Sequence, residues 1–376
     1  MNGSLTPAER LKFFLMSEGL AITPEAQAHI DHSNGDRPMT PADYASTSGV
    51  ILALEDDVWV NAPIADYNPN FVTAPENLLG LDGHSLVVRG HGFESGAEFW
   101  LPPAYHGQVN VDGEPYNSYA FTHADRVRIS PIEGCSMTCK FCDLPYEFRY
   151  RTKSVDGLVA SVQRAITDEI QPAAHVLISG GTPRQSDFEY VQEVYEAVIT
   201  GFPDLDVDIM MVPLDGLLDL ARLRELGVNE LSINIEIFNS DIARKYMRRK
   251  FDQGQDHYLA FLEAAATAVG PGRVRSMLMV GLEPMEDTLA GVTAIAERGC
   301  VPVLSPFRPD EATPLRALTP PSAAVLEETY LRAREITAAQ GVALGPSCVP
   351  CSHNTLTLSA TGSGEASEFH GRPHLI

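Results

Sequence analysis

The sequence predicts an α/β protein whose larger part is a partial (β/α)6 barrel. From about Arg126 onward, short apolar runs rich in β-branched residues alternate with stretches of helical periodicity. The residues before this point lack the alternation, and their short apolar runs are broken by glycine, proline and asparagine. Strands that alternate with helices form parallel sheets with right-handed crossovers. Six such units therefore predict an open or partial barrel of the TIM type.

The repeating part of the chain contains six expected strands with five expected helices between them. The strands are expected at 126–132, 175–179, 206–212, 230–235, 273–280 and 301–306, and the helices at 155–169, 187–200, 215–226, 256–268 and 285–298. A further helix at 321–339 and a short seventh strand at 342–345 complete the pattern. In a parallel barrel the functional residues lie at the carboxyl ends of the strands, so motifs that follow strands are the candidates for chemistry.

This pattern divides the chain into three regions. Residues 1–122 form an N-terminal accessory region, for which a helix at 7–18 and short strands at 49–54, 85–89 and 97–101 are expected but no fold is predicted. Residues 123–345 form the barrel. Residues 346–376 form a C-terminal extension that carries a C-x2-C pair.

Composition excludes several classes of partner. The net charge is −23, from 27 basic and 50 acidic residues, which argues against nucleic acid or an anionic membrane as the main partner. No window approaches the ~18 consecutive apolar residues of a membrane helix, and the N-terminus lacks the features of a signal peptide. A cytoplasmic location is therefore expected. Thiols stay reduced there, so clustered cysteines indicate a metal site rather than disulfides.

Three cysteines follow the first expected barrel strand directly. Cys135, Cys139 and Cys142 have the spacing C-x3-C-x2-C, in a loop that opens onto the functional face. Three thiolates hold three irons of a [4Fe–4S] cluster and leave the fourth iron without a protein ligand. The alternatives are a zinc ion with a distant fourth ligand, or free thiols.

With Phe141 before the last cysteine, the motif resembles the signature of the radical S-adenosylmethionine (SAM) superfamily. The resemblance implies that SAM binds the open iron through its amino and carboxylate groups. It also implies that an electron from the cluster breaks a C–S bond of SAM and produces a 5′-deoxyadenosyl radical. The implied partners are SAM, a substrate that the sequence does not identify, and an electron donor such as flavodoxin or ferredoxin.

A glycine pair follows the second expected strand. In the superfamily a Gly-Gly motif here binds the amino group of SAM, which assigns that role to Gly180 and Gly181. Thr182 stands where many members have an acidic residue. A plain turn between strand and helix is the alternative interpretation, because glycines at a strand end also permit ordinary close approach of the backbone.

The fourth expected strand ends in the polar residues Asn234 and Glu236. The resemblance implies that a carboxylate here, Glu236, binds the ribose hydroxyls of SAM; a solvent-facing strand end is the alternative. The basic stretch that follows contains Arg248 and Arg249, either of which has the guanidinium geometry suited to the SAM carboxylate. A basic helix surface explains these arginines equally well.

The last expected strands resemble the biotin synthase and lipoyl synthase group. The stretch 277–283 is similar to a strand of that group, although Glu283 and Pro284 stand where Gly-Glu is common. Arg308, at the end of the sixth expected strand, is a candidate for substrate contact. The resemblance covers roughly residues 125–345.

Cys348 and Cys351 form a second C-x2-C pair, which is half of a metal site. If the seventh strand forms, the pair faces the same side as the first cluster. The interpretations left open are an auxiliary iron–sulfur cluster, a structural role, zinc or another metal, and redox or substrate thiols. Further ligands are sought among His353, His370 and His374, because Cys300 precedes a strand and is expected to be a small buried residue.

The leading hypothesis is a radical SAM enzyme that abstracts hydrogen from its substrate, with sulfur insertion by an auxiliary cluster as the favoured subtype. A mutase, lyase, epimerase or dehydrogenase of the same superfamily is the first alternative. A non-catalytic iron–sulfur or zinc-binding protein on the same fold is the alternative from another class.

Overall fold

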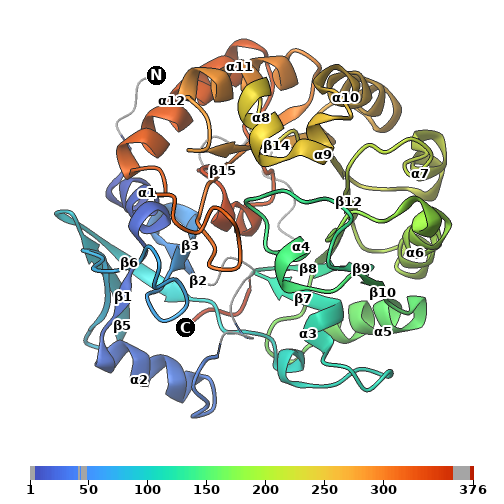
Figure 1. Ribbon diagram of the computed structural model, residues 1–376. Coiled ribbons are helices and arrows are strands. Elements are labelled where there is room, and N and C mark those ends of the chain that lie inside the picture. The colour runs from blue at the N-terminus through green and yellow to red at the C-terminus, as the bar shows by residue number, and fades with distance from the viewer. Residues whose placement is uncertain (1–4, 41–42, 44–48, 359–372) are drawn as a thin grey trace.

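The computed structural model describes residues 5–40, 43, 49–358 and 373–376. Its larger sheet has seven strands in the spatial order β15-β14-β13-β12-β11-β8-β7, and Figure 1 shows these strands inside an arc of helices. The strands are β7 (Ala120–His123), β8 (Arg126–Ile129), β11 (His175–Ile178), β12 (Val207–Met210), β13 (Leu231–Ser232), β14 (Val274–Val280) and β15 (Val301–Pro306). The six strands from β8 to β15 are parallel, which confirms the partial barrel.

The helices form an arc outside these strands (Figure 1). They are α5 (Val155–Ile166), α6 (Phe188–Gly201), α7 (Leu220–Leu226), α8 (Ser240–Tyr246), α9 (Arg248–Phe251), α10 (Gln255–Val269), α11 (Met285–Ala296) and α12 (Ala323–Ala339). Local chemistry defines several ends. The hydroxyls of Ser154 and Ser322 cap the first turns of α5 and α12, and Gly227 ends α7 with a left-handed backbone.

The fourth barrel strand is shorter than the sequence predicts. The expected strand 230–235 reduces to β13, and beyond it the regular ladder with β14 gives way to a single bridge from Glu236 to Leu278. The side chain of Asn234 takes the place of the missing ladder there, because its oxygen accepts a hydrogen bond from the Met277 N–H at 3.1 Å. Because β13 ends early, the sheet is open at the carboxyl ends of its strands, where the candidate site lies.

The expected seventh strand at 342–345 was wrong. Only Gly345 pairs with the sheet, through one parallel bridge to Val303, and the chain leaves the edge at Pro346, which has no N–H to continue a ladder. The seventh strand of the sheet is β7 instead, which pairs antiparallel with β8 at the opposite edge.

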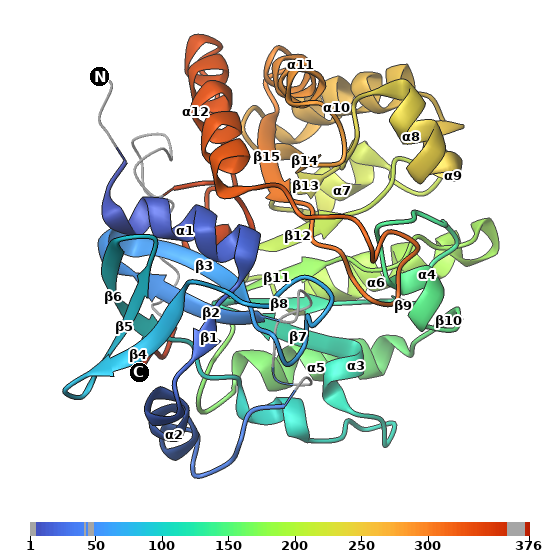
Figure 2. The same cartoon turned by 60° about the vertical axis from the view of Figure 1, so that its left-hand side comes forward.

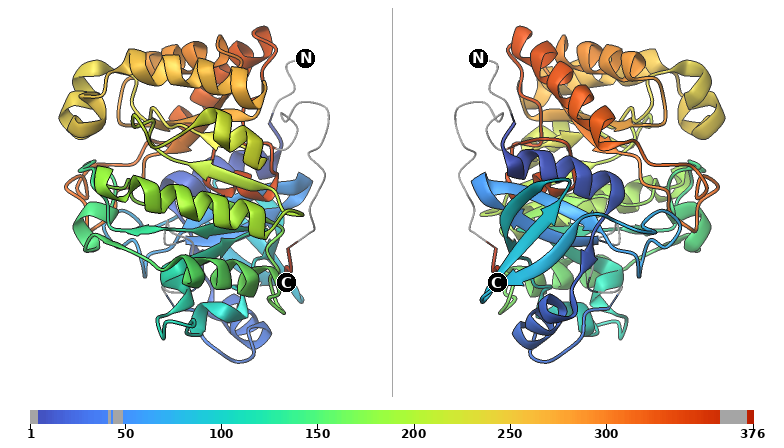
Figure 3. Two further views of the ribbon diagram at one scale, coloured as in Figure 1. Left: turned by 90° about the vertical axis from the view of Figure 1, so that its right-hand side faces the viewer. Right: turned by 90° about the vertical axis from the view of Figure 1, so that its left-hand side faces the viewer.

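The N-terminal region forms its own six-stranded sheet, in the order β1-β4-β5-β6-β2-β3. The expected helix at 7–18 and the expected strand at 49–54 are confirmed as α1 and β2. The elements are α1 (Pro7–Glu18), β1 (Ala21–Ile22), α2 (Pro24–Ser33), β2 (Gly49–Leu54), β3 (Val58–Pro63), β4 (Leu78–Asp82), β5 (Ser85–Gly90), β6 (Phe93–Phe99) and α3 (Tyr116–Tyr119). Figures 2 and 3 show this sheet beside the barrel, between α12 and the β7 edge.

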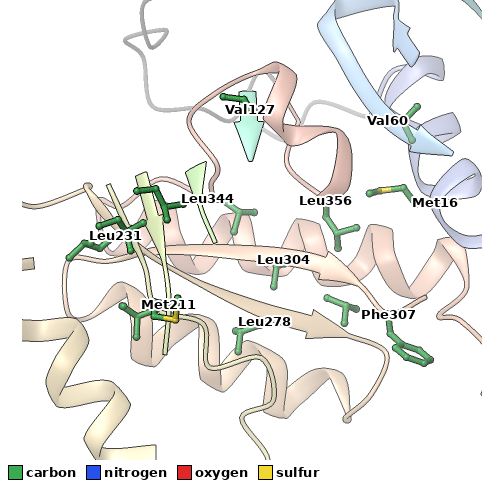
Figure 4. Packing of buried hydrophobic residues seen from close by; sticks show 14 of the residues in the cluster. Met16, Val60, Val127, Met211, Leu231, Leu278, Leu304, Phe307, Leu344 and Leu356 are labelled. Carbon is green, nitrogen blue, oxygen red and sulfur yellow. The ribbon is translucent and has the colours of Figure 1, made fainter. Parts of the chain in front are cut away.

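The N-terminal sheet and the barrel share one hydrophobic core. Met16 of α1 and Val60 of β3 lie beside Leu304 of β15 and Leu356 of the C-terminal extension (Figure 4). Polar contacts join the same parts, because the Ser17 hydroxyl donates to the Pro321 carbonyl at 2.7 Å. The N-terminal region therefore covers the open side of the partial barrel. Within the described residues, no helix combines the length and the apolar character needed to span a membrane.

The C-terminal extension runs back through the barrel rather than along its outside. Its short helix η5 (Pro350–Asn354) is buried, and the Leu356 N–H donates to the Leu304 carbonyl at 2.8 Å. Lys12 of α1 holds the extension from the other side, since its ammonium lies 3.1 Å from the Ser352 carbonyl oxygen and 2.6 Å from that of Thr357.

Burial lowers the pKa of Lys12 to about 7, so its contribution to stability depends on pH. Between about pH 7 and pH 10.5, the ordinary lysine pKa, Lys12 is protonated in the unfolded chain but not in the folded chain. We expect the free energy of unfolding of the wild type, minus that of Lys12→Met, to rise with pH in this window, by up to ~1.4 kcal/mol per pH unit. Urea denaturation of both proteins at several pH values measures this difference, and a flat difference would contradict the assignment.

Candidate active site

The three cysteines of the first motif surround one cavity at the carboxyl ends of the barrel strands. Its volume is about 130 Å3, and Phe141, Gly180, Thr182, Asn234, Glu236 and Lys250 line it together with Cys135, Cys139 and Cys142. The remaining lining residues, Met137, Leu144, Met210, Met211 and Val212, are apolar. The sequence motifs after β8, β11 and β13 therefore meet in one place, as the barrel rule predicts.

The glycine pair holds the cysteine loop in position. A Cβ atom on Gly181 would lie 1.6 Å from the carbonyl oxygen of Gly134, just before the first cysteine, and Gly180 has a positive φ of 117°. The Ser136 N–H donates to the Thr182 carbonyl at 3.0 Å. At Gly181 the close approach that requires glycine is thus made by the chain's own cysteine loop.

This contact predicts a strong effect of Gly181→Ala. Because the obstructing atoms belong to the backbone, the cysteine loop has to shift, and we expect the free energy of unfolding to fall by about 1–3 kcal/mol, with reduced iron loading. Gly201→Ala, at the end of α6, is the matched control, since no atom lies within 4 Å of the added Cβ. We expect that control to change stability by less than about 0.5 kcal/mol. Urea denaturation and iron analysis of both variants measure these effects, and equal behaviour would contradict the steric argument.

The donor set fits a metal cluster. The N–H groups of Thr182 and Met137 both donate to the Cys135 sulfur, at 3.2 and 3.3 Å. Burial raises the pKa of Cys139 to about 12, and burial followed by the neighbouring Asp143 carboxylate raises that of Cys142. Without a cation these two thiols would stay protonated at neutral pH, whereas bound metal deprotonates a coordinating thiol.

Glu236 and Lys250 form a buried ion pair in the wall of the cavity. Their Oε2 and Nζ atoms are 2.9 Å apart, and Lys250 also donates to the Asn234 carbonyl at 3.0 Å. Burial lowers the pKa of Lys250, but the Glu236 carboxylate outweighs it and holds that pKa above its usual range. Glu236 has a positive φ of 69°, a backbone conformation that costs a non-glycine residue of order 1–3 kcal/mol and is concentrated at functional sites.

Lys250 is the cavity residue that sequence reasoning missed. It belongs to the basic stretch after β13, where attention fell on the arginines. Arg248 instead lies outside the cavity lining, exposed and paired with Asp252 at 2.8 Å. Arg249 donates to the Ser136 carbonyl of the cysteine loop. Burial of the third basic residue within a charged stretch is decided by how α9 packs, and a sequence window does not reveal it.

Arg308 lies at the junction between the barrel and the N-terminal sheet. It is largely buried, and its guanidinium donates to the side-chain and backbone oxygens of Asn61 in β3, at 2.9 and 2.6 Å. Burial lowers the pKa of Arg308 to about 9. The Arg308 side chain therefore contacts the N-terminal sheet.

The second cysteine pair lies at the other end of the barrel. Cys348 and Cys351 approach Asp125 and His175, which stand at the amino ends of β8 and β11. The expectation that the pair faces the first cluster was wrong, because it depended on the strand at 342–345 that does not form. Gly180 follows His175 by five residues and lies just past the end of β11 (His175–Ile178). At ~3.3 Å per residue, the glycine motif and the second cysteine pair are therefore up to roughly 17 Å apart.

The expected histidine ligands are not the ones that the described residues bring to this pair. His353 is buried and its Nδ1 contacts the Pro350 carbonyl oxygen at 2.7 Å, while His374 bonds to Gln171 through its backbone. His370 lies outside the described residues. Cys300 is fully buried beside the Leu262 carbonyl, as expected for a small buried residue.

A comparison with known proteins matches the part of the chain that carries the first three cysteines. The family model of the Radical SAM superfamily matches residues 129–290, a span that contains Cys135, Cys139, Cys142, Gly180, Gly181, Glu236 and Lys250. The fold and the site thus define a class: this chain contains a domain of the radical SAM superfamily. The match ends well before Cys348 and Cys351.

Two curated relatives share low sequence identity with the chain. Bacteriochlorophyllide c C-7(1)-hydroxylase of Chlorobaculum limnaeum is 25% identical over 127 residues, which is 33% of this chain and 32% of the relative. Oxygen-independent coproporphyrinogen III oxidase of Synechocystis sp. is 23% identical over 163 residues, which is 39% of this chain and 34% of the relative. The chain thus spans about a third of the length of the curated relatives it matches.

Solved structures with a similar fold include a radical SAM methyltransferase from Sphaerobacter thermophilus and the FeFe-hydrogenase maturase HydG from Carboxydothermus hydrogenoformans. The first is 16% identical with a TM-score of 0.45, and covers 75% of this chain and 77% of that chain. The second is also 16% identical with a TM-score of 0.45, and covers 65% and 62%.

Proposed function

We propose that this protein is a radical SAM enzyme that reductively cleaves SAM and abstracts a hydrogen atom from a substrate bound at the carboxyl ends of the barrel strands. The observation that carries the proposal is the single cavity in which Cys135, Cys139 and Cys142 face Gly180 and the Glu236–Lys250 pair. All of these residues lie within the span that matches the superfamily.

The chain's own residues would bind and shield the reacting groups. The three cysteines would hold a [4Fe–4S] cluster, and the backbone of Gly180, Gly181 and Thr182 beside Cys135 would bind the amino group of SAM. When bound, the cluster and SAM supply a 5′-deoxyadenosyl radical by reductive cleavage of a C–S bond. The apolar side chains that line the cavity exclude water, which protects a reactive species from side reactions.

The Glu236–Lys250 pair has the chemistry to bind the polar part of SAM. A carboxylate accepts hydrogen bonds from ribose hydroxyls, and Lys250 pairs with that carboxylate inside the barrel. Lys250 also offers a cation where the resemblance alone suggested Arg248. A non-catalytic electron carrier needs no such polar pair beside its cluster, and this favours an enzyme. An electron donor of the flavodoxin or ferredoxin type completes the proposal.

The position of the second cysteine pair bears on the subtype. A cluster at Cys348 and Cys351, up to roughly 17 Å from the glycine motif, is poorly placed to deliver sulfur to a substrate at the first site. Sulfur insertion and the biotin and lipoyl synthase subgroup therefore receive no support from this geometry. Neither curated relative is named for sulfur insertion; their names describe a hydroxylase and an oxidase. Hydrogen abstraction followed by rearrangement, elimination, epimerisation or oxidation is the class we favour.

Anaerobic reconstitution of the wild-type chain tests the proposal. We expect about four irons per chain and formation of 5′-deoxyadenosine from SAM under reduction. Glu236→Gln is expected to keep the iron and to raise the SAM concentration at half-maximal cleavage, because the neutral amide accepts weaker hydrogen bonds from hydroxyls. A protein that binds four irons but never cleaves SAM would leave an electron carrier as the better description.

A further inference from the structure

We propose that Asp125, His175, Cys348 and Cys351 bind one zinc ion at the amino ends of the barrel strands. Asp125 lies between β7 and β8, His175 begins β11, and the two cysteines flank the start of η5. Asp125, His175 and Cys351 are buried and Cys348 is nearly so. A buried carboxylate, an imidazole and two thiols that converge on one point are typical of a metal site, because buried charges are paired or coordinate metals.

The distances between the ligand atoms match one tetrahedral ion. Bond lengths of ~2.3 Å to sulfur and ~2.0–2.1 Å to nitrogen and oxygen place tetrahedral S and N or O ligands about 3.6 Å apart, and N and O ligands about 3.3 Å apart. The His175 Nε2 lies 3.3 Å from Asp125 Oδ1, 3.5 Å from the Cys351 sulfur and 3.7 Å from that of Cys348. Asp125 Oδ1 lies 3.5 Å from the Cys348 sulfur and 3.7 Å from the Cys351 sulfur.

The donor set favours zinc over an iron–sulfur cluster. Zinc accepts a tetrahedral mixture of thiolate, imidazole and carboxylate, whereas [4Fe–4S] clusters are held by cysteine thiolates, typically four. The four ligand atoms also lie within 4.8 Å of one another, which suits the coordination sphere of one ion, while a cluster spreads its protein ligands over several irons. The Cys351 N–H donates to the Cys348 sulfur at 3.3 Å, which stabilises a coordinating thiolate.

Four protein ligands leave no open position for substrate, so the site is structural. The ion would join the C-terminal extension to the amino ends of β8 and β11. Leu356 and Leu358 are buried just beyond this anchor. A metal ion that binds the folded arrangement contributes its binding free energy to folding.

Zinc and iron analysis of anaerobically purified chain tests the site. We expect about one zinc per chain in the wild type. The variants Cys351→Ser and Asp125→Ala should lose at least about nine-tenths of this zinc and keep their capacity for four irons. Cys300→Ser is the matched control, because that cysteine is buried elsewhere, and it should keep the zinc. Asp125→Cys should also keep it, since three thiolates and one imidazole form an established zinc donor set.

X-ray absorption at the zinc edge of the wild type needs no variant and separates the alternatives. Two sulfur and two nitrogen or oxygen neighbours are expected, whereas zinc with only nitrogen and oxygen neighbours would overturn the proposal. Wild-type protein free of zinc, or a loss of iron instead of zinc in Cys351→Ser, would also overturn it, the latter in favour of an auxiliary cluster. None of these outcomes depends on SAM cleavage. The experiment therefore tests the zinc site independently of the proposed activity.

Discussion

Replacing Cys142 with alanine is expected to abolish 5′-deoxyadenosine formation and to remove the four irons of the reconstituted protein. Cys142 is one of three thiols that line the cavity, and a three-cysteine site has no spare ligand. The loss should be all but complete, because the radical can form only at an intact cluster. Iron analysis, the visible absorption of the cluster and chromatography of the SAM products measure the effect together.

Cys300→Ala is the matched control for this experiment. Cys300 is also a buried cysteine, but it precedes β15 at the amino end of that strand and lies against the Leu262 carbonyl. Iron content and SAM cleavage should stay at the wild-type level. If Cys142→Ala retained four irons and cleaved SAM, the cavity would not be the cluster site. If Cys300→Ala lost both as well, the effect of Cys142→Ala would reflect general misfolding.

Lys250→Met is expected to be the most destabilising substitution in the site. It leaves the Glu236 carboxylate in the cavity wall without its cation, and breaking a buried ion pair in this way costs about 3–5 kcal/mol. The Asn234 carbonyl loses its donor at the same time. We expect a lower urea midpoint, and a thermal midpoint lower by roughly 4–6 °C. Denaturation curves of the metal-free chain measure this directly.

The double variant Lys250→Met/Glu236→Leu separates stability from binding. Replacing both charges by apolar groups of similar volume removes the unpaired carboxylate, so most of the lost stability should return. The binding of SAM should not return, because no carboxylate remains for the ribose hydroxyls. A double variant that is as unstable as Lys250→Met, or that binds SAM as tightly as the wild type, would contradict the role given to this pair.

Local patterns in the sequence determined the barrel and the core of the site. Strands and helices differ in the spacing of apolar residues along the chain, and this spacing is a local property. The parallel strands and outer helices could therefore be predicted one unit at a time. Cys135, Cys139 and Cys142 lie within eight residues of one another, and Gly180 and Glu236 each follow a strand. Since all parallel strands of a barrel end on one face, sequence position alone was enough to bring these residues together.

Tertiary structure decided what depends on contacts between distant segments. Lys250 lies in the cavity wall because its ammonium meets the Glu236 carboxylate and the Asn234 carbonyl just beyond β13. Nothing in its basic neighbourhood distinguishes it from Arg248. Cys348 and Cys351 meet Asp125 and His175 from more than 170 residues away, at the end of the barrel opposite the first cluster. One bridge at Gly345, in place of a strand, redirects the extension through the barrel. That path follows from burial of Leu356 and Leu358 in a shared core, a long-range packing effect that no local pattern contains.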